Sequence, residues 1–205
     1  YFNEVKNINA DIKIIKCKNW KRNMFQIDWG IPFVPTSPAI KSFNAMMFYP
    51  GLVLLEATNI SEGRGSTLSF EAAGAPWIHP EILSEKLDHY ISYLTNFVPT
   101  ESKYANTVCY GAQFITDIEY GLLVRPVICG LLFIKTIYDL FPQHFRWKPY
   151  PTNVNPMGKN HLDKLLGIQQ SERLFLLPKE KFNRKIKQLI KVPDWKKQIK
   201  KYLLY

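Results

Sequence analysis

The sequence is poor in cysteine and has no long hydrophobic run, and each absence excludes a class of protein. Three cysteines are present, and their odd number and wide spacing match neither a zinc site nor a CxxC redox pair. The longest apolar stretch, residues 122–134, is interrupted by Arg125 and Pro126, so it is too short to cross a membrane. We therefore expect no disulfide framework, no metal centre and no membrane span.

Motifs for nucleotides, metals and nucleic acids are also missing. The chain contains no GxxxxGKS/T phosphate loop, no GxGxxG fingerprint and no HExxH pair, and its four histidines lack the spacing of metal ligands. It contains no zinc finger, no RNP-type aromatic strand and no basic leucine zipper. We therefore expect no cofactor and no nucleic-acid partner.

What is present describes a globular chain. Of the 205 residues, 46% are hydrophobic and 21% are charged, which suits one ordinary domain or one domain carrying a piece of a neighbour. The aromatic content of 14% is compatible both with core packing and with stacking on sugar rings. The chain opens at Tyr1 with neither an initiator Met nor a signal peptide, so we expect an upstream portion to be missing.

The formal net charge of +10 is concentrated near the C-terminus. Ten lysines and arginines lie between residues 179 and 201, where Glu180 and Asp194 are the opposing acids. The solvated face of an amphipathic helix gives this pattern, and we favour that interpretation. An anionic glycan, nucleic acid or membrane surface is the alternative partner for these cations.

Residue periodicity predicts two parts joined by a connector. Residues 12–18 alternate between apolar and polar side chains, which predicts a strand at the end of a βα repeat. The proline-rich segment 31–38 predicts an extended domain boundary. Beyond it we predict a helix that begins at Ser42, a resumed helix or a buried strand over 52–55, further helices over 81–94, 125–140, 161–166, 179–190 and 194–204, and strands over 97–99 and 113–118.

The most unusual chemistry lies in residues 56–77, which read EATNISEGRGSTLSFEAAGAPW. Gly63 and Gly65 flank Arg64 and allow positive φ angles and the close approach of a ligand. Arg64 offers a planar fork of donors for a carboxylate, and Glu62 can accept from sugar hydroxyls or pair with Arg64. A ligand-binding loop and a tight turn locked by that ion pair are both compatible with this pattern.

Short segments over nearly the whole chain resemble the exo-β-N-acetylmuramidase (NamZ) family. In the loop region these segments are YPG at 49–51, LE at 55–56, TNISEGRGS at 58–66 and GAPWI at 74–78. Before it stand FNE at 2–4, WKR at 20–22, GIP at 30–32 and PTSP at 35–38. After it stand FVP at 97–99, KY at 103–104, CYG at 109–111, TD at 116–117, RP at 125–126, FRW at 145–147, HLD at 161–163, LG at 166–167 and YLLY at 202–205.

The resemblance implies a two-part α/β protein. Residues 1–38 would be the end of an N-terminal Rossmann-like domain whose remainder is missing, and residues 39–205 a smaller mixed α/β domain with terminal amphipathic helices. The family removes N-acetylmuramic acid from the non-reducing ends of peptidoglycan chains, which implies a bacterial glycoside hydrolase, a peptidoglycan-derived glycan as partner and a secreted or periplasmic location. The family's proposed catalytic carboxylate lies in the N-terminal domain, so this chain is expected to be inactive without that half.

The resemblance and the loop chemistry together suggest site residues. We predict Glu62 as the catalytic residue, which would orient hydroxyls or assist acid/base chemistry, and we expect it to face an open crevice together with Arg64. Arg64 would bind the lactyl carboxylate of muramic acid or hold Glu62 in place. The predicted substrate-binding residues are Asn59, Ser61, Arg64, Tyr104 and Arg125.

Two other functions stay open. The chain departs from the family's pattern at Ala39, Ala57 and His79, and a loss of polar contacts there would alter specificity or activity. A non-catalytic peptidoglycan-binding module is therefore the main alternative. A binder of anionic surfaces that uses the terminal lysines is the other, and it would associate in a strongly salt-dependent way.

Overall fold

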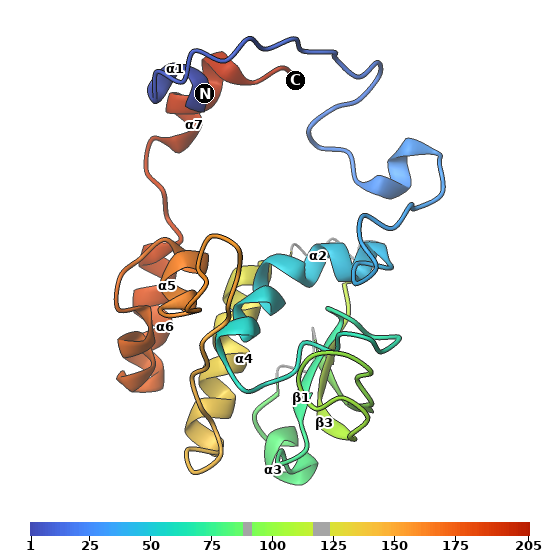
Figure 1. Ribbon diagram of the computed structural model, residues 1–205, viewed down its shortest axis with the longest axis vertical. Coiled ribbons are helices and arrows are strands. Elements are labelled where there is room, and N and C mark those ends of the chain that lie inside the picture. The colour runs from blue at the N-terminus through green and yellow to red at the C-terminus, as the bar shows by residue number, and fades with distance from the viewer. Residues whose placement is uncertain (88–91, 117–123) are drawn as a thin grey trace. The chain divides into compact units, whose positions relative to one another are not determined.

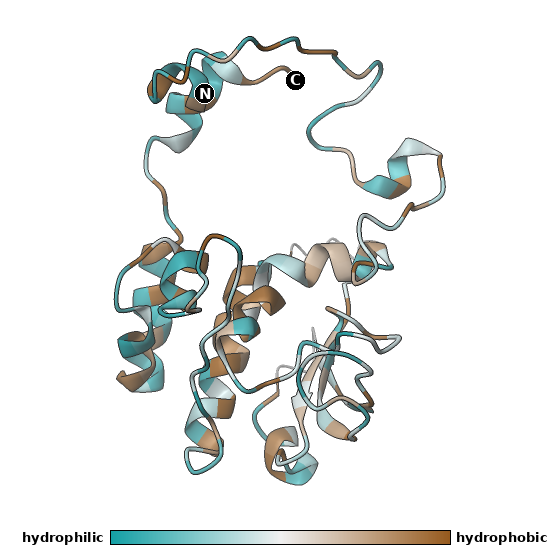
Figure 2. Ribbon diagram, viewed as in Figure 1, coloured by the Kyte–Doolittle hydropathy of each residue, from teal (hydrophilic) through white to brown (hydrophobic). Residues whose placement is uncertain are grey.

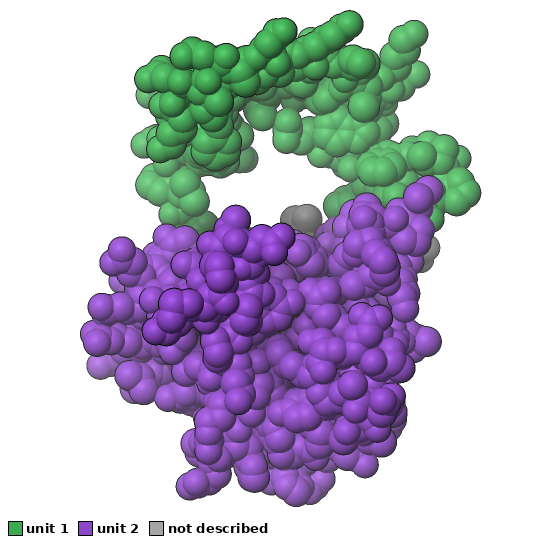
Figure 3. Space-filling model, in the orientation of Figure 1, with its two compact units in different colours: residues 1–33, 188–205 green, residues 34–187 purple. Residues whose placement is uncertain are grey.

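The computed structural model describes residues 1–87, 92–116 and 124–205 (Figure 1). The chain divides into two compact units, residues 1–33 with 188–205 and residues 34–187 (Figure 3). The division between residues 33 and 34 falls inside the predicted connector 31–38. Helices and a small antiparallel sheet make the fold mixed α/β, as predicted. The assignment of residues 1–38 to a Rossmann-like domain stays a prediction.

The smaller unit contains helical turns and extended chain. Its elements are α1 (Phe2–Val5), η1 (Gln26–Trp29), α7 (Trp195–Ile199) and η4 (Lys200–Tyr202). The strand predicted over residues 12–18 is wrong, because this segment is exposed and has no strand partner among the described residues. Alternation of side chains gives a segment two faces, but a strand also needs a neighbour to complete its hydrogen bonds.

The larger unit holds the sheet and the longer helices. Its helical elements are α2 (Phe43–Leu52), η2 (Val53–Ala57), α3 (Pro80–Ser84), α4 (Pro126–Leu140), α5 (His161–Leu166), η3 (Ser171–Leu176) and α6 (Lys179–Leu189). The strands β1 (Ala72–Ala75), β2 (Ser92–Phe97) and β3 (Cys109–Phe114) pair antiparallel in the order β1-β3-β2. The register pairs Gly74 with Gly111 and Leu94 with Ala112.

Local signals placed several helices correctly. The Ser42 hydroxyl accepts the N–H of Ala45 at 2.9 Å and caps α2, as predicted. Pro126 stands in the first turn of α4, where its missing N–H costs no hydrogen bond. Gly167 ends α5 in the left-handed conformation. α4 and α6 each show a hydrophobic and a hydrophilic side in Figure 2.

The helix predicted over residues 81–94 is wrong in its second half. The structure has a helix only over Pro80–Ser84, and Ser92–Phe97 form β2 in the sheet. Residues 88–91 lie outside the described ranges. The apolar side chains in this stretch fit a helical face by spacing, but backbone pairing with β3 determines the conformation of the later residues. The strand predicted over 113–118 is correct only for residues 113–114: β3 runs from Cys109 to Phe114, residues 115–116 are not in a strand, and residues 117–118 lie outside the described ranges.

Two glycines allow α2 and α4 to pack with their backbones in contact. A Cβ placed on Gly130 would lie 2.2 Å from the carbonyl oxygen of Gly51. A Cβ placed on Gly51 would lie 1.9 Å from the carbonyl oxygen of Pro126. The two helices cannot separate to make room for a larger side chain, because each buries large side chains such as Phe48 and Ile134 in the core.

The substitution Gly130→Ala is expected to destabilise the larger unit by about 3 kcal/mol, the upper part of the range for overpacking. In a helix without this contact, the same change would stabilise by about 1 kcal/mol, because alanine has the higher helix propensity. Urea unfolding followed by circular dichroism measures the sign of the change in the free energy of unfolding. The comparison variant is Gly167→Ala, where no atom lies within 4 Å of the added Cβ. Any loss of stability there comes from the backbone φ of +69° and not from a packing clash. A Gly130→Ala variant more stable than the parent would contradict the packing argument.

Cys109 lies in the core of the sheet, against Ala72 and Phe97. Burial raises the pKa of its thiol to about 11. At pH 8 the reactive thiolate fraction is then more than about a hundredfold below that of an ordinary thiol. We expect iodoacetamide to label the exposed Cys17 first, and labelling of Cys109 to accelerate about tenfold per pH unit below its pKa. Peptide mass spectrometry measures both rates, and equal labelling at pH 8 would contradict this assignment.

Candidate active site

The loop that follows η2 is held by backbone hydrogen bonds. Ser61 pairs with Gly74 through two of them, and the N–H of Phe70 donates to the carbonyl of Glu62 at 2.9 Å. Gly63 and Gly65 adopt φ angles of +74° and +78°, as their predicted role requires. The chain therefore turns sharply around Arg64 and returns into β1.

Two buried acids and two partly buried cations form a network at this loop. The Glu62 side chain is only 1% exposed; one oxygen accepts from Arg64 Nε at 2.8 Å and the other from Lys103 Nζ at 3.0 Å. Arg64 Nη2 also donates to Glu56 Oε1 at 2.5 Å. Arg64 thus bridges two carboxylates, and the ion pair predicted from the sequence is one link in a larger network.

The two cations respond differently to their surroundings. Burial lowers the pKa of Lys103, and the neighbouring Glu62 carboxylate only partly offsets this. Burial also opposes the charge of Arg64, but the hydrogen bond to Glu56 and the charge of Glu62 raise its pKa. Lys103 Nζ donates in addition to the carbonyls of Leu55 and Ile60, at 2.7 and 2.8 Å. All three donors of its ammonium group are therefore used within the protein.

An open pocket of about 490 Å³ lies beside this network. Its size falls within the range of small-ligand sites. Glu56 is the one acid among its described lining residues, and Lys103, Arg146 and Lys148 are the cations. The full lining is Glu56, Thr58, Asn59, Ser102, Lys103, Tyr104, Arg146, Lys148, Pro149 and Tyr150.

Glu56 is held from two sides at the pocket wall. Oε1 accepts from Arg64, and Oε2 lies 3.2 Å from Nε2 of His161, the first residue of α5. The Nδ1 atom of His161 is buried and has no hydrogen-bond partner among the residues that the structure describes, and the centroid of its ring lies 4.8 Å from that of Tyr150. Burial raises the pKa of the Tyr150 hydroxyl, and the nearby Glu56 charge adds to this. Because each carboxylate oxygen can accept about two hydrogen bonds, Glu56 keeps capacity for one ligand hydroxyl beside its contacts with Arg64, His161 and the Tyr150 hydroxyl.

Tyr104 lines the pocket, and its hydroxyl is fixed. It accepts from Trp77 Nε1 at 2.9 Å and donates to the carbonyl of Asn59 at 2.8 Å. The Asn59 side chain is also engaged, because its amide donates to the carbonyl of His144 and its oxygen accepts the N–H of Arg146. Both predicted residues therefore shape the pocket wall.

The other predicted residues lie elsewhere. Glu62 points into the interior, so the expectation that it faces an open crevice is wrong; charge neutralisation by two cations holds it there. Arg64 is 25% exposed but does not line the pocket. Ser61 is buried and accepts from the N–H of Gly63, and Arg125 is exposed before α4, away from the pocket lining.

Among the pocket residues with ionisable side chains, sequence reasoning missed Glu56 and four others. The missed residues besides Glu56 are Lys103, Arg146, Lys148 and Tyr150. Three segments of the family resemblance, LE at 55–56, KY at 103–104 and FRW at 145–147, contained a signal for three of the five. The positions that depart from the family's pattern, Ala39, Ala57 and His79, do not line the pocket.

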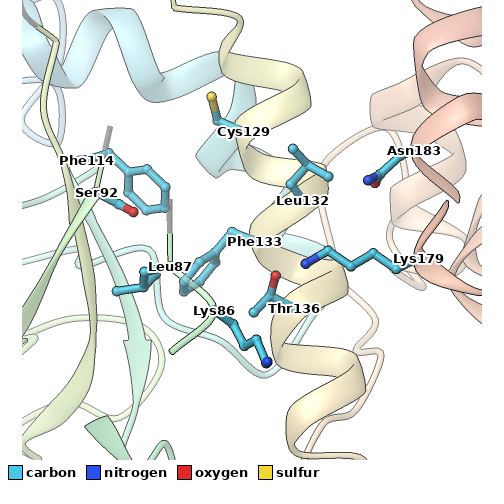
Figure 4. A pocket seen from close by; sticks show the side chains of 10 residues that line it. All are labelled: Lys86, Leu87, Ser92, Phe114, Cys129, Leu132, Phe133, Thr136, Lys179 and Asn183. Atoms are coloured by element: carbon cyan, nitrogen blue, oxygen red, sulfur yellow. The ribbon is translucent and has the colours of Figure 1, made fainter. Parts of the chain in front are cut away.

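A second, smaller pocket of about 210 Å³ lies between β3, α4 and α6 (Figure 4). Its lining includes Lys86 and Lys179 together with the apolar side chains of Phe114 and Phe133. Its described lining has no acid. The pocket at Glu56 is therefore the better candidate of the two for hydrolysis that uses a carboxylate.

Within the described ranges, no three His, Cys, Asp or Glu side chains are grouped so as to hold a metal ion. No helix in the same ranges is long and apolar enough to cross a bilayer.

The fold and the site define a mixed α/β domain with a carboxylate anchored at the wall of an open, cation-rich pocket. Residues 47–205 match the family model described as exo-β-N-acetylmuramidase NamZ, C-terminal. The chain belongs to this family. It is 38% identical over 172 residues to the peptidoglycan β-N-acetylmuramidase NamZ of Bacillus subtilis strain 168, a match that covers 81% of this chain and 39% of that protein.

Two crystal structures of DUF1343 family proteins from Bacteroides fragilis share the fold. The first has a TM-score of 0.69 at 21% identity and covers 92% of this chain and 49% of its own. The second has a TM-score of 0.54 at 23% identity and covers 96% of this chain and 49% of its own. The chain thus spans about two fifths of the curated relative and half of each solved structure.

Proposed function

We propose that this chain is the C-terminal part of a glycoside hydrolase that removes N-acetylmuramic acid from the non-reducing ends of peptidoglycan chains. Its family membership supports this proposal. The observation that carries it is the position of Glu56, whose carboxylate is anchored by Arg64 and His161 at the wall of the pocket. The upstream Rossmann-like half and a secreted or periplasmic location belong to the same proposal.

Glu56 is the carboxylate of this chain that contacts the sugar. Most glycosidases use two carboxyl groups on opposite sides of the scissile bond. Because Glu56 is the one acid in the described lining, the second comes from the N-terminal half. Glu56 accepts a sugar hydroxyl or assists proton transfer, and the rings of Tyr104 and Tyr150 provide surfaces on which the sugar can stack.

Glu62 and Arg64 act through Glu56. Arg64 joins the two acids, and Glu62 fixes Arg64 from the buried side. Preorganised charges of this kind need no rearrangement during the reaction. Glu62 is therefore a positioning residue in this proposal, although the loop chemistry first suggested a direct catalytic role.

The test is the release of N-acetylmuramic acid from a chromogenic β-muramide by the full-length protein. The Glu56→Gln and Glu62→Gln variants test whether both acids are needed for turnover. Loss of turnover in both with intact sugar binding supports Glu56 as the contacting group and Glu62 as its support. Full rates in both variants would remove this network from the mechanism.

A non-catalytic peptidoglycan-binding module is the second candidate. The single acid in the described pocket lining favours it, because one carboxylate is enough to bind a sugar and is commonly not enough to hydrolyse it. Calorimetry with N-acetylmuramic acid decides between the two. Binding without turnover, even in the full-length protein, would establish the module and exclude the hydrolase.

A further inference from the structure

The segment that follows α4 places two cations side by side on the pocket. The carbonyl of Arg146 accepts the N–H of Asn59, the N–H of Arg146 donates to the Asn59 side-chain oxygen, and the N–H of Lys148 donates to the carbonyl of Ala57 at 2.8 Å. Trp147, between them, packs into an aromatic cluster with Phe145 and Phe175. Because side chains alternate along extended chain, Arg146 and Lys148 share the face opposite Trp147. Both line the pocket.

These two cations carry charge that no carboxylate of the described residues neutralises. Neither has a carboxylate within salt-bridge distance in the part of the chain that the structure describes. One guanidinium nitrogen of Arg146 donates to the carbonyl of Phe145 at 2.7 Å, which orients the group and leaves its other nitrogens available. Lys148 is exposed at the pocket edge.

The remaining cations near the pocket are already committed. Lys103 donates its three hydrogen bonds to Glu62 and to two backbone carbonyls. Arg64 is shared between Glu56 and Glu62, so it is a poor candidate for the carboxylate of a ligand. Among the described lining residues, the unneutralised positive charge is therefore that of Arg146 and Lys148, and both line the same pocket as Glu56.

We infer that Arg146 and Lys148 form an anion subsite that binds the lactyl carboxylate of the muramic acid. This inference rests on the proposed function and names the residues that set its specificity. N-acetylglucosamine, the other sugar of peptidoglycan, lacks the lactyl group. A carboxylate held by an arginine fork and a lysine gains charge-assisted hydrogen bonds that a neutral sugar cannot make. Arg64, which the sequence suggested for this task, instead holds the catalytic carboxylate.

The test compares N-acetylmuramic acid with its lactyl carboxamide, a ligand of the same shape without the charge. Calorimetry on the 205-residue chain and on the full-length protein gives both affinities. We expect the parent to prefer the acid by about 10- to 100-fold, as charge-assisted hydrogen bonds imply. Lys148→Met and Arg146→Met should each reduce the preference, and the double variant should abolish it while still binding the carboxamide.

The control is Lys159→Met, which removes an exposed lysine outside the pocket lining and should leave the preference unchanged. An unchanged preference for the acid in the double variant would overturn the inference. So would equal affinities of the parent for the acid and the carboxamide. Turnover of the chromogenic muramide is scored separately. Turnover without any charge preference refutes only the anion subsite, and charge preference without turnover refutes only the hydrolase.

Discussion

Glu56→Gln in the full-length protein is expected to lower kcat on a chromogenic β-muramide by about 10³-fold, within the range for loss of a group that assists proton transfer. Glutamine keeps the size of the side chain but cannot carry the charge or exchange a proton. The substrate still meets Tyr104, Tyr150 and the two cations of the anion subsite. We therefore expect the affinity for N-acetylmuramic acid to change less than about tenfold, so the loss appears in kcat rather than in KM.

The matched control is Glu101→Gln, the same change at an exposed acid that does not line the pocket. It should retain full activity. Glu56→Asp provides a second variant, because it keeps the charge but withdraws the carboxylate by one methylene. A thermal melt of each variant shows whether the fold is intact. A well-folded Glu56→Gln protein with more than about a tenth of the parent rate would exclude Glu56 from proton transfer.

The parts of the fold that follow from local chemistry could be predicted from the sequence. Ser42 caps a helix, Pro126 begins one and Gly167 ends one because each acts on its own backbone or on immediate neighbours. The turn around Arg64 also follows from local chemistry, because Gly63 and Gly65 predict positive φ angles without any long-range information.

The parts that depend on distant contacts could not be predicted. Residues 92–97 join the sheet because β3 pairs with them, and the strand expected at residues 12–18 is absent because no described strand lies beside it. The same limit applies to the site. The Glu56 carboxylate is held in position by Arg64, eight positions later in the sequence, and by His161, more than a hundred positions later. Composition around Glu56 gives no indication that these partners meet.

The site illustrates how contact with a pocket separates two chemically similar buried acids. Glu56 and Glu62 both pair with Arg64, yet the pocket opens onto Glu56 while Lys103 closes the network behind Glu62. An acid that is neutralised and enclosed stabilises its neighbours and has little capacity for a ligand. An acid at a pocket wall with free acceptor capacity can bind one. The two roles therefore predict different consequences when each charge is removed.

Glu62→Gln is expected to destabilise the larger unit by about 3 to 5 kcal/mol, the range for removal of one partner from a buried ion pair. The change leaves the ammonium of Lys103, whose side chain is 18% exposed, next to a neutral amide that also presents an N–H donor. Arg64 loses one of its two carboxylates. Urea unfolding of the chain at neutral pH measures the loss.

A double-mutant cycle with Lys103→Met attributes the effect to the pair. The double variant should lose about 2 kcal/mol less free energy of unfolding than the sum of the losses in Glu62→Gln and Lys103→Met. The reason is that the second substitution removes the cation that the first left unpaired. The control is Glu81→Gln, which breaks the exposed ion pair with His79 and should have no measurable effect. Additive single losses, or a Glu62→Gln variant as stable as the control, would show that Glu62 is not held by charge.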